Sequence, residues 1–136
     1  MLTCHIPSAG PLCRDDVIAS LKRAYDFYPQ YKINGVLPVA VHSWLLYPPY
    51  QGIVFPEGSN IYVFNNLFDI VEYAESDKYG DLWRVFNVEY SEGCIPSLPE
   101  DTSMQRRLKE FLLEGNKMGD AHGILLFDGE KVLTEK

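Results

Sequence analysis

The stretch VAVHSWLL, residues 39–46, decides the predicted fold. It opens with three apolar residues in succession, a pattern typical of a strand buried inside a sheet. We therefore predict a strand over residues 36–43 with both faces buried, as in a sheet covered by helices. Pro38 indicates the first residues of this strand or a sheet edge, because proline donates no ladder hydrogen bond. His42 and Ser43 then interrupt the apolar run and mark the predicted end of the strand.

Upstream of this stretch, the chain predicts one short strand and one helix. Residues 2–6 form the strand candidate, and the apolar residues within 14–28 recur at helical spacing. Pro29 directly follows that helix, where proline commonly stops one. If the helix makes the usual right-handed crossover, the two strands run parallel and their carboxyl ends lie at one edge of the sheet.

Downstream, the patterns are weaker at first. Ser59 is a candidate N-cap for a helix that carries apolar residues as far as Phe68. Residues 69–76 alternate as a strand does, and residues 79–87 fit either a helix or a strand.

The last elements carry clearer signals. Thr102 and Gln105 have the spacing of a capping box at the start of a helix that Gly115 ends. Residues 123–134 are two apolar runs around Asp128-Gly129, which predicts a C-terminal β-hairpin. The predicted fold class is therefore α/β (α+β), a mixed sheet flanked by helices, and residues 1–136 are expected to form a single domain.

Composition excludes several classes of function. The 136 residues carry a formal net charge of −7, which repels a nucleic-acid backbone. The three cysteines lack metal-ligand or disulfide spacing, so we expect free thiols and no metal. The N-terminus has no signal-peptide pattern, and no apolar run approaches the roughly 20 residues of a membrane span. We expect a cytoplasmic protein that contacts neither nucleic acid nor membrane.

Two histidines are the candidate functional residues. His5 and His42 lie near the ends of the two strands expected to be parallel, and ligand crevices in open α/β sheets lie outside such ends. A neutral imidazole there could act as a general base. The alternative is structural, because a histidine at a strand end often bonds a neighbouring carbonyl and orders a loop. Ser43 adjoins His42 but points to the opposite face, so the two do not form a catalytic dyad.

An aromatic cluster follows the decisive strand. Its members could line a pocket for an acyl or flat group, or could seal a loop over the core, which we favour. They are Tyr47, Tyr50, Phe55, Tyr62 and Phe64.

Five blocks in order carry a family resemblance: HIPSAGPL at 5–12, VAVHSWLL at 39–46, SNIYVFNNLFDIV at 59–71, DLWRVF at 81–86 and LPEDTSMQRRLKEFLLEGN at 98–116. With these blocks the chain resembles the GNAT-like C-terminal domain of bacterial two-part acyltransferase-domain proteins. The resemblance implies a GNAT-like fold, the fold of N-acyltransferases that use acetyl-CoA or another acyl-CoA. It also implies a partner, either a separate N-terminal domain or a second copy in a homodimer.

The chain departs both from the pattern of this family and from the general pattern of GNAT enzymes. Ala9 replaces a glycine, and Cys13 and Arg14 replace a Thr-Pro pair that would cap the first helix, which weakens the cap by about 1 kcal/mol. The pyrophosphate-binding (Q/R)xxGx(G/A) turn of GNAT enzymes is also absent, since RRLKEF at 106–111 has its basic start without the glycines. The cofactor-binding residues therefore stay unassigned.

Two functional hypotheses follow, and the sequence leaves open whether the chain is an enzyme. The first is transfer of an acyl group from a coenzyme A thioester to an amine, with His42 as general base and His5 or Ser43 orienting the substrate or the thioester carbonyl. The second is a non-catalytic GNAT-like domain that binds a ligand or docks a partner. One fold hosts many functions, so the fold alone does not decide between them.

Overall fold

A four-stranded mixed sheet organises the protein. The computed structural model describes residues 2–4, 12–76, 82–88, 91 and 93–136. Within them the strand order is β1-β2-β4-β3. The strands are β1 (Leu2–Thr3), β2 (Leu37–Ser43), β3 (Asp69–Ser76) and β4 (Met118–Phe127). The predicted parallel pairing of the first two strands is confirmed, and β4 runs antiparallel to both β2 and β3. Pro38 lies at the start of β2, as predicted.

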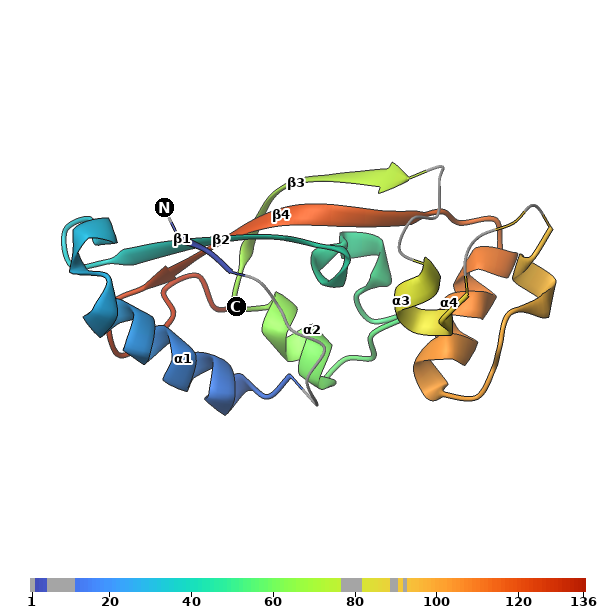
Figure 1. Ribbon diagram of the computed structural model, residues 1–136, viewed down its shortest axis with the longest axis horizontal. Helices are drawn as coiled ribbons and strands as arrows, with labels where there is room; N and C mark the ends of the chain where they lie inside the picture. The colour runs from blue at the N-terminus through green and yellow to red at the C-terminus, as the bar shows by residue number, and fades with distance from the viewer. Residues whose placement is uncertain (1, 5–11, 77–81, 89–90, 92) are drawn as a thin grey trace.

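The α-helices of the described residues lie on one side of this sheet (Figure 1). They are α1 (Arg14–Phe27), α2 (Asn60–Asn65), α3 (Leu82–Phe86) and α4 (Ser103–Leu113). The prediction that both faces of β2 are buried is therefore wrong for its carboxyl end. Val39 and Val41 face the helices and are buried, whereas His42 is exposed on the opposite face. We call the face that carries His42 the outer face.

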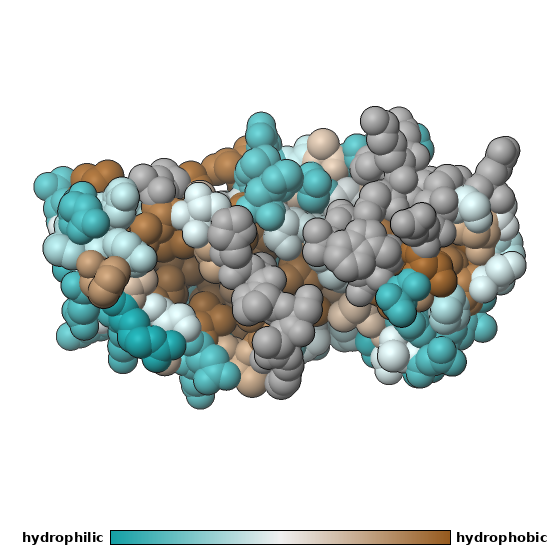
Figure 2. All heavy atoms as spheres, in the orientation of Figure 1, coloured by the Kyte–Doolittle hydropathy of each residue, from teal (hydrophilic) through white to brown (hydrophobic). Residues whose placement is uncertain are grey.

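Two clusters of buried side chains form the core. The first joins α1 and α2 to the inner face of the sheet, where Leu21 and Phe64 pack with Val41, Leu125 and Phe127. Figure 2 shows apolar side chains gathered in this region between α1 and the sheet. The second cluster packs α3 and α4 against the start of β4 and the segment that follows β2. It includes Tyr50, Phe55, Phe86, Leu108, Phe111 and Met118.

The helix N-termini follow the local sequence. Ser59 accepts a bond from the Tyr62 N–H and caps α2, as predicted. At α4 the predicted capping box forms, because the Thr102 side chain accepts the Gln105 N–H while the Gln105 side chain accepts the Thr102 N–H. Cys13 is the N-cap of α1 but makes no side-chain capping bond, in agreement with the expected weak cap.

Three predicted elements differ in extent or type from the structure. The segment at 79–87, which fitted helix or strand, contains the short helix α3. The helix α2 ends at Asn65 rather than near Phe68. The predicted turn at Asp128-Gly129 forms, but its returning arm is not a regular strand. It pairs with β4 through the isolated bridge between Phe127 and Val132, the bond from Leu133 N–H to the Leu126 carbonyl, and the bond from Leu126 N–H to the Thr134 hydroxyl.

Candidate functional site

The outer face of the sheet carries a stacked pair of histidines. His42 on β2 lies directly opposite His122 on β4 in the antiparallel register. Their ring centroids are 3.9 Å apart and their planes differ by 12°. The side chains of both residues are about half exposed, at 52% and 47%, so neither ring is needed to fill the core.

A carboxylate lies beside each ring. The Nε2 atom of His42 is 3.2 Å from Oδ1 of Asp120, which is two residues before His122 on the same face of β4. The Nε2 atom of His122 is 3.7 Å from Oε1 of Glu72 on β3. A carboxylate beside one ring nitrogen favours the proton there and leaves the other nitrogen with a lone pair. In His42 the nitrogen beside the carboxylate is Nε2, so Nδ1 is the ring nitrogen that faces away from Asp120.

The sequence predicts His42 as a site residue but does not predict its neighbours. His122, Asp120 and Glu72 reach the site only through the pairing of β4 with β2 and β3. The available signal was the segment GDAHG at 119–123, where small residues alternate with Asp120 and His122. That alternation is typical of a strand with one face packed closely on the core and one polar face.

The other two predicted site residues do not join this cluster in the described structure. Ser43 ends β2 and its hydroxyl accepts the Leu45 N–H at 3.1 Å, so it caps the following 3-10 turn, Trp44–Leu46. It lies on the face opposite His42, as expected for adjacent strand residues. His5 lies outside the described residues, so its prediction stays untested.

The thiol next to His5 has no sign of reactivity. Cys4 packs against the first core cluster, and burial raises the pKa of its thiol. A raised pKa disfavours the thiolate, which is the nucleophilic form.

The aromatic residues after β2 are mainly packing groups. Tyr50 and Phe55 are 0% and 1% exposed, and their rings meet edge to face at 5.7 Å. Tyr47 is also buried, and burial, together with Glu75 and Tyr73, raises the pKa of its hydroxyl. These contacts agree with a loop sealed over the core rather than with a ligand pocket.

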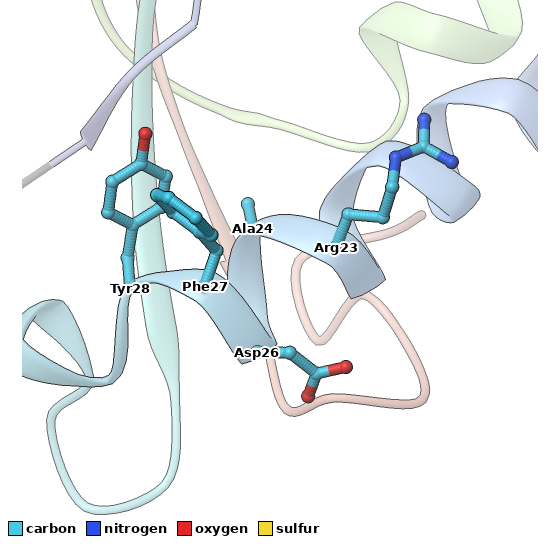
Figure 3. A pocket seen from close by; sticks show the side chains of 5 residues that line it. All are labelled: Arg23, Ala24, Asp26, Phe27 and Tyr28. Carbon is cyan, nitrogen blue, oxygen red and sulfur yellow. The ribbon is translucent and has the colours of Figure 1, made fainter.

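A depression of about 590 Å³ lies elsewhere, at the carboxyl end of α1. In Figure 3, Phe27 and Tyr28 lie side by side, whereas Arg23 and Asp26 point away from them. Phe27 is 75% exposed, so the depression is open to solvent. It adjoins the segment that leads into β2, whereas the histidine pair lies at the other end of that strand. The two features therefore do not share one site.

Neither a metal-binding cluster nor a membrane-spanning helix occurs among the described residues. Among them, no group of three or more histidine, cysteine, aspartate or glutamate side chains is placed to hold a metal ion. None of the helices in this part of the chain has the length and apolarity needed to cross a membrane.

Comparison with known proteins identifies the family. The sequence profile of a family described as the GNAT-like C-terminal domain matches residues 1–125. The chain belongs to this family, which confirms the resemblance seen in its sequence. No curated protein matches the chain.

Solved structures with similar folds are acyltransferases. A crystal structure of an acyltransferase in complex with decanoyl-CoA is 26% identical, with a TM-score of 0.70 over 90% of this chain and 38% of that one. An acyltransferase in complex with decanoyl-CoA and teicoplanin is 25% identical, with a TM-score of 0.71 over 90% and 39%. An acyltransferase mutant in complex with octanoyl-CoA is 24% identical, with a TM-score of 0.72 over 90% and 39%. The present chain thus spans about two fifths of the length of these proteins.

Proposed function

We propose that this domain acts in transfer of an acyl group from a coenzyme A thioester to an amine, with His42 as the general base. The observation that carries the proposal is the exposed imidazole of His42 with the Asp120 carboxylate 3.2 Å from Nε2. This arrangement leaves Nδ1 available for a proton, and the open outer face of the sheet leaves it accessible to a substrate. A base oriented by a carboxylate is a recurring arrangement in acyl-transfer catalysis.

The reaction needs one proton acceptor and one leaving group. The amine nitrogen attacks the thioester carbonyl carbon, the new C–N bond forms, and the C–S bond breaks as the thiolate leaves. His42 accepts the proton that the amine nitrogen loses, and Asp120 stabilises the resulting imidazolium. A positioned base of this kind contributes about 10²- to 10⁴-fold to the rate. Of the two candidates for orienting the substrate or the thioester carbonyl, we propose His5. Ser43 is not assigned this role, because its side chain lies on the face opposite His42 and accepts the Leu45 N–H.

The donor that we propose is a medium-chain acyl-CoA. Acyltransferases with a similar fold have been solved in complex with octanoyl-CoA or decanoyl-CoA. These complexes support a medium-chain acyl-CoA, rather than acetyl-CoA, as the donor. One of them also binds teicoplanin, so an amine on a glycopeptide is the first acceptor to test. Donor and acceptor are both small molecules.

A second polypeptide part is proposed to complete the site. The chain spans only about 39% of the similar acyltransferases, and its histidine pair lies on the exposed outer face of the sheet. Exclusion of water strengthens electrostatic interactions in a site, and a cover over this face would provide it. We propose that this cover is an N-terminal half or, in a homodimer, a second copy.

One observation favours the alternative of a non-catalytic domain that binds a ligand or docks a partner. The N-terminus of α4 uses its own side chains as caps, since the Gln105 carboxamide oxygen accepts the N–H groups of Asp101 and Thr102 at 2.8 and 3.1 Å. We therefore assign no coenzyme A pyrophosphate to this helix end; RRLKEF, further along α4, lacks the glycines of the GNAT turn.

The test is release of the coenzyme A thiol from octanoyl-CoA in the presence of an amine panel that includes teicoplanin. We expect turnover that falls about 10²- to 10⁴-fold in His42→Gln. The matched control is Ile124→Ala, a change on the same face of β4, which should keep most of the activity. Equal turnover in His42→Gln and the parent would refute the assignment of the base.

A further inference from the structure

The histidine pair is a surface feature that folding does not require. Both rings are about half exposed, at 52% and 47% of the side chain, although they stack with centroids 3.9 Å apart. Cross-strand neighbours in an antiparallel sheet always meet, but they need not stack with their planes within 12°. The parallel arrangement is therefore a specific orientation of the rings.

The contacts hold the imidazole of His42 on two sides. Its ring face rests on His122, and its ring edge, at Nε2, meets the Asp120 carboxylate at 3.2 Å. The second ring is itself beside a carboxylate, since its Nε2 lies 3.7 Å from Glu72 on β3. The contacts thus run across three strands, from β2 through β4 to β3.

Rotation of a histidine ring about its Cβ–Cγ bond is normally broad, because this torsion has no sharp staggered wells. A flat neighbour at stacking distance restricts the plane of the ring, since tilting one ring would drive its atoms into the other. Two orientations related by a half turn remain in that plane, and the Asp120 carboxylate selects the one with Nε2 beside it. If the ring of His42 turned, Nε2 would also leave Asp120 and the proton would no longer be favoured on that nitrogen.

We propose that His122 is a positioning residue for His42, whose stacked ring keeps Nε2 against Asp120 and leaves Nδ1 as the proton-accepting nitrogen. The proposal rests on the proposed function in so far as it treats His42 as the base. The role assigned to His122 depends on its flat ring and not on its ability to carry a proton.

The tautomer of His42 tests this directly. Nitrogen-detected imidazole spectra of the full chain, recorded at pH 8, distinguish Nε2–H from Nδ1–H, and the sequence holds only three histidines. We expect the parent to carry the proton on Nε2. His122→Ala should give a mixture of tautomers, whereas His122→Phe, which retains a flat ring without nitrogen, should preserve the tautomer of the parent.

Two further variants complete the test. Asp120→Asn should reduce the preference for Nε2–H even with His122 present, and Ile124→Ala should leave the spectrum of the parent unchanged. The parent tautomer retained in His122→Ala would overturn the proposal, as would a His122→Phe spectrum identical to that of His122→Ala. These readouts need no substrate, so absent acyl transfer would count against the proposed function and not against the positioning role.

Kinetics supply the second readout. With octanoyl-CoA as donor, His122→Ala should lower kcat about 10- to 100-fold with little change in KM for the donor, because the base is misplaced while donor contacts remain. His122→Phe should restore most of kcat. A kcat that is equally low in both variants would instead indicate that His122 transfers a proton, and would overturn the positioning role.

Discussion

Substitution of Gly119 by alanine should destabilise the fold, because the backbone of β4 passes very close to two neighbours at this position. A Cβ atom on Gly119 would lie 2.3 and 2.5 Å from the Tyr47 ring and 2.7 Å from the carbonyl oxygen of Ala74, against ordinary contacts of 3.4–4 Å. The Tyr47 ring is 4% exposed and packs on Tyr50 at 4.8 Å, so it has little room to move. The Ala74 oxygen belongs to the backbone of β3 and moves only with that strand.

The expected cost follows from these contacts. Overpacking of a core lowers the free energy of unfolding by about 1–3 kcal/mol. Replacing a glycine by alanine in an extended segment raises it by about 0.4–1 kcal/mol, because the unfolded chain loses conformational entropy. With a backbone atom among the clashing neighbours, we expect a net loss of about 2 kcal/mol. For a chain of this size that corresponds to a Tm lower by roughly 8 °C.

Urea unfolding followed by tryptophan fluorescence measures this loss. Gly58→Ala is the control for the added Cβ itself, because nothing lies within 4 Å of it; unlike Gly119, Gly58 has a positive φ, of +85°, which is unusual for alanine. The free energy of unfolding of Gly58→Ala should fall by only about 1 kcal/mol, which is the cost of holding alanine in the left-handed backbone region. A Gly119→Ala protein within about 0.5 kcal/mol of the parent would refute the close approach of β4 to Tyr47.

Three further changes test the local structure. Cys13→Ser should stabilise the protein by about 1 kcal/mol in urea unfolding, because the N-cap of α1 then gains the side-chain bond that it lacks; no gain would contradict this. Thr102→Ala should cost about 1 kcal/mol in the same assay by breaking the capping box of α4, and an unchanged midpoint would argue against that box. The hydrogen bond from Arg14 lowers the pKa of the Glu135 carboxyl group below its usual value near 4.3. The ion pair therefore stabilises the folded protein fully at pH values above that usual pKa. Its contribution is lost as the pH falls through the lowered pKa of Glu135. Glu135→Gln should therefore reduce the loss of stability on acidification below about pH 4 by up to 1 kcal/mol, and identical pH profiles would show that the pair contributes nothing.

Local signals predicted the elements that depend on local interactions. The spacing of Thr102 and Gln105 was sufficient for the start of α4, because both partners of a capping box lie within one helical turn. The apolar run before His42 likewise predicted β2 and its end at Ser43. Its parallel pairing with β1 followed from a general rule of crossover handedness.

The site could be predicted only in part, because its geometry is set by strand register. His42 is visible in the sequence as an interruption of an apolar run, but His122 lies 80 positions later and becomes its neighbour only when β4 pairs with β2. The hairpin predicted over residues 123–134 begins after His122, so the sequence predicts no strand at this residue. The sequence also does not predict that the outer face is exposed. The apolar run Val39-Ala40-Val41 predicts burial on both faces of β2, but Ala40, which lies on the outer face, is only half-buried. Because alanine is small and apolar, its presence does not indicate which face of the strand is open to solvent.

The most direct test of the proposed function is calorimetric titration of the purified chain with octanoyl-CoA, decanoyl-CoA and free coenzyme A. Binding of a donor precedes any chemistry and can be measured without knowing the acceptor. We expect saturable binding of the acyl-CoA ligands with micromolar dissociation constants, on the order of −8 kcal/mol. His42→Gln should bind them equally well, because its proposed role is in proton transfer. An absence of binding at millimolar acyl-CoA would contradict an acyl-CoA-handling role for this chain on its own. Repeating the titration with the proposed N-terminal half would then separate an incomplete site from the non-catalytic alternative.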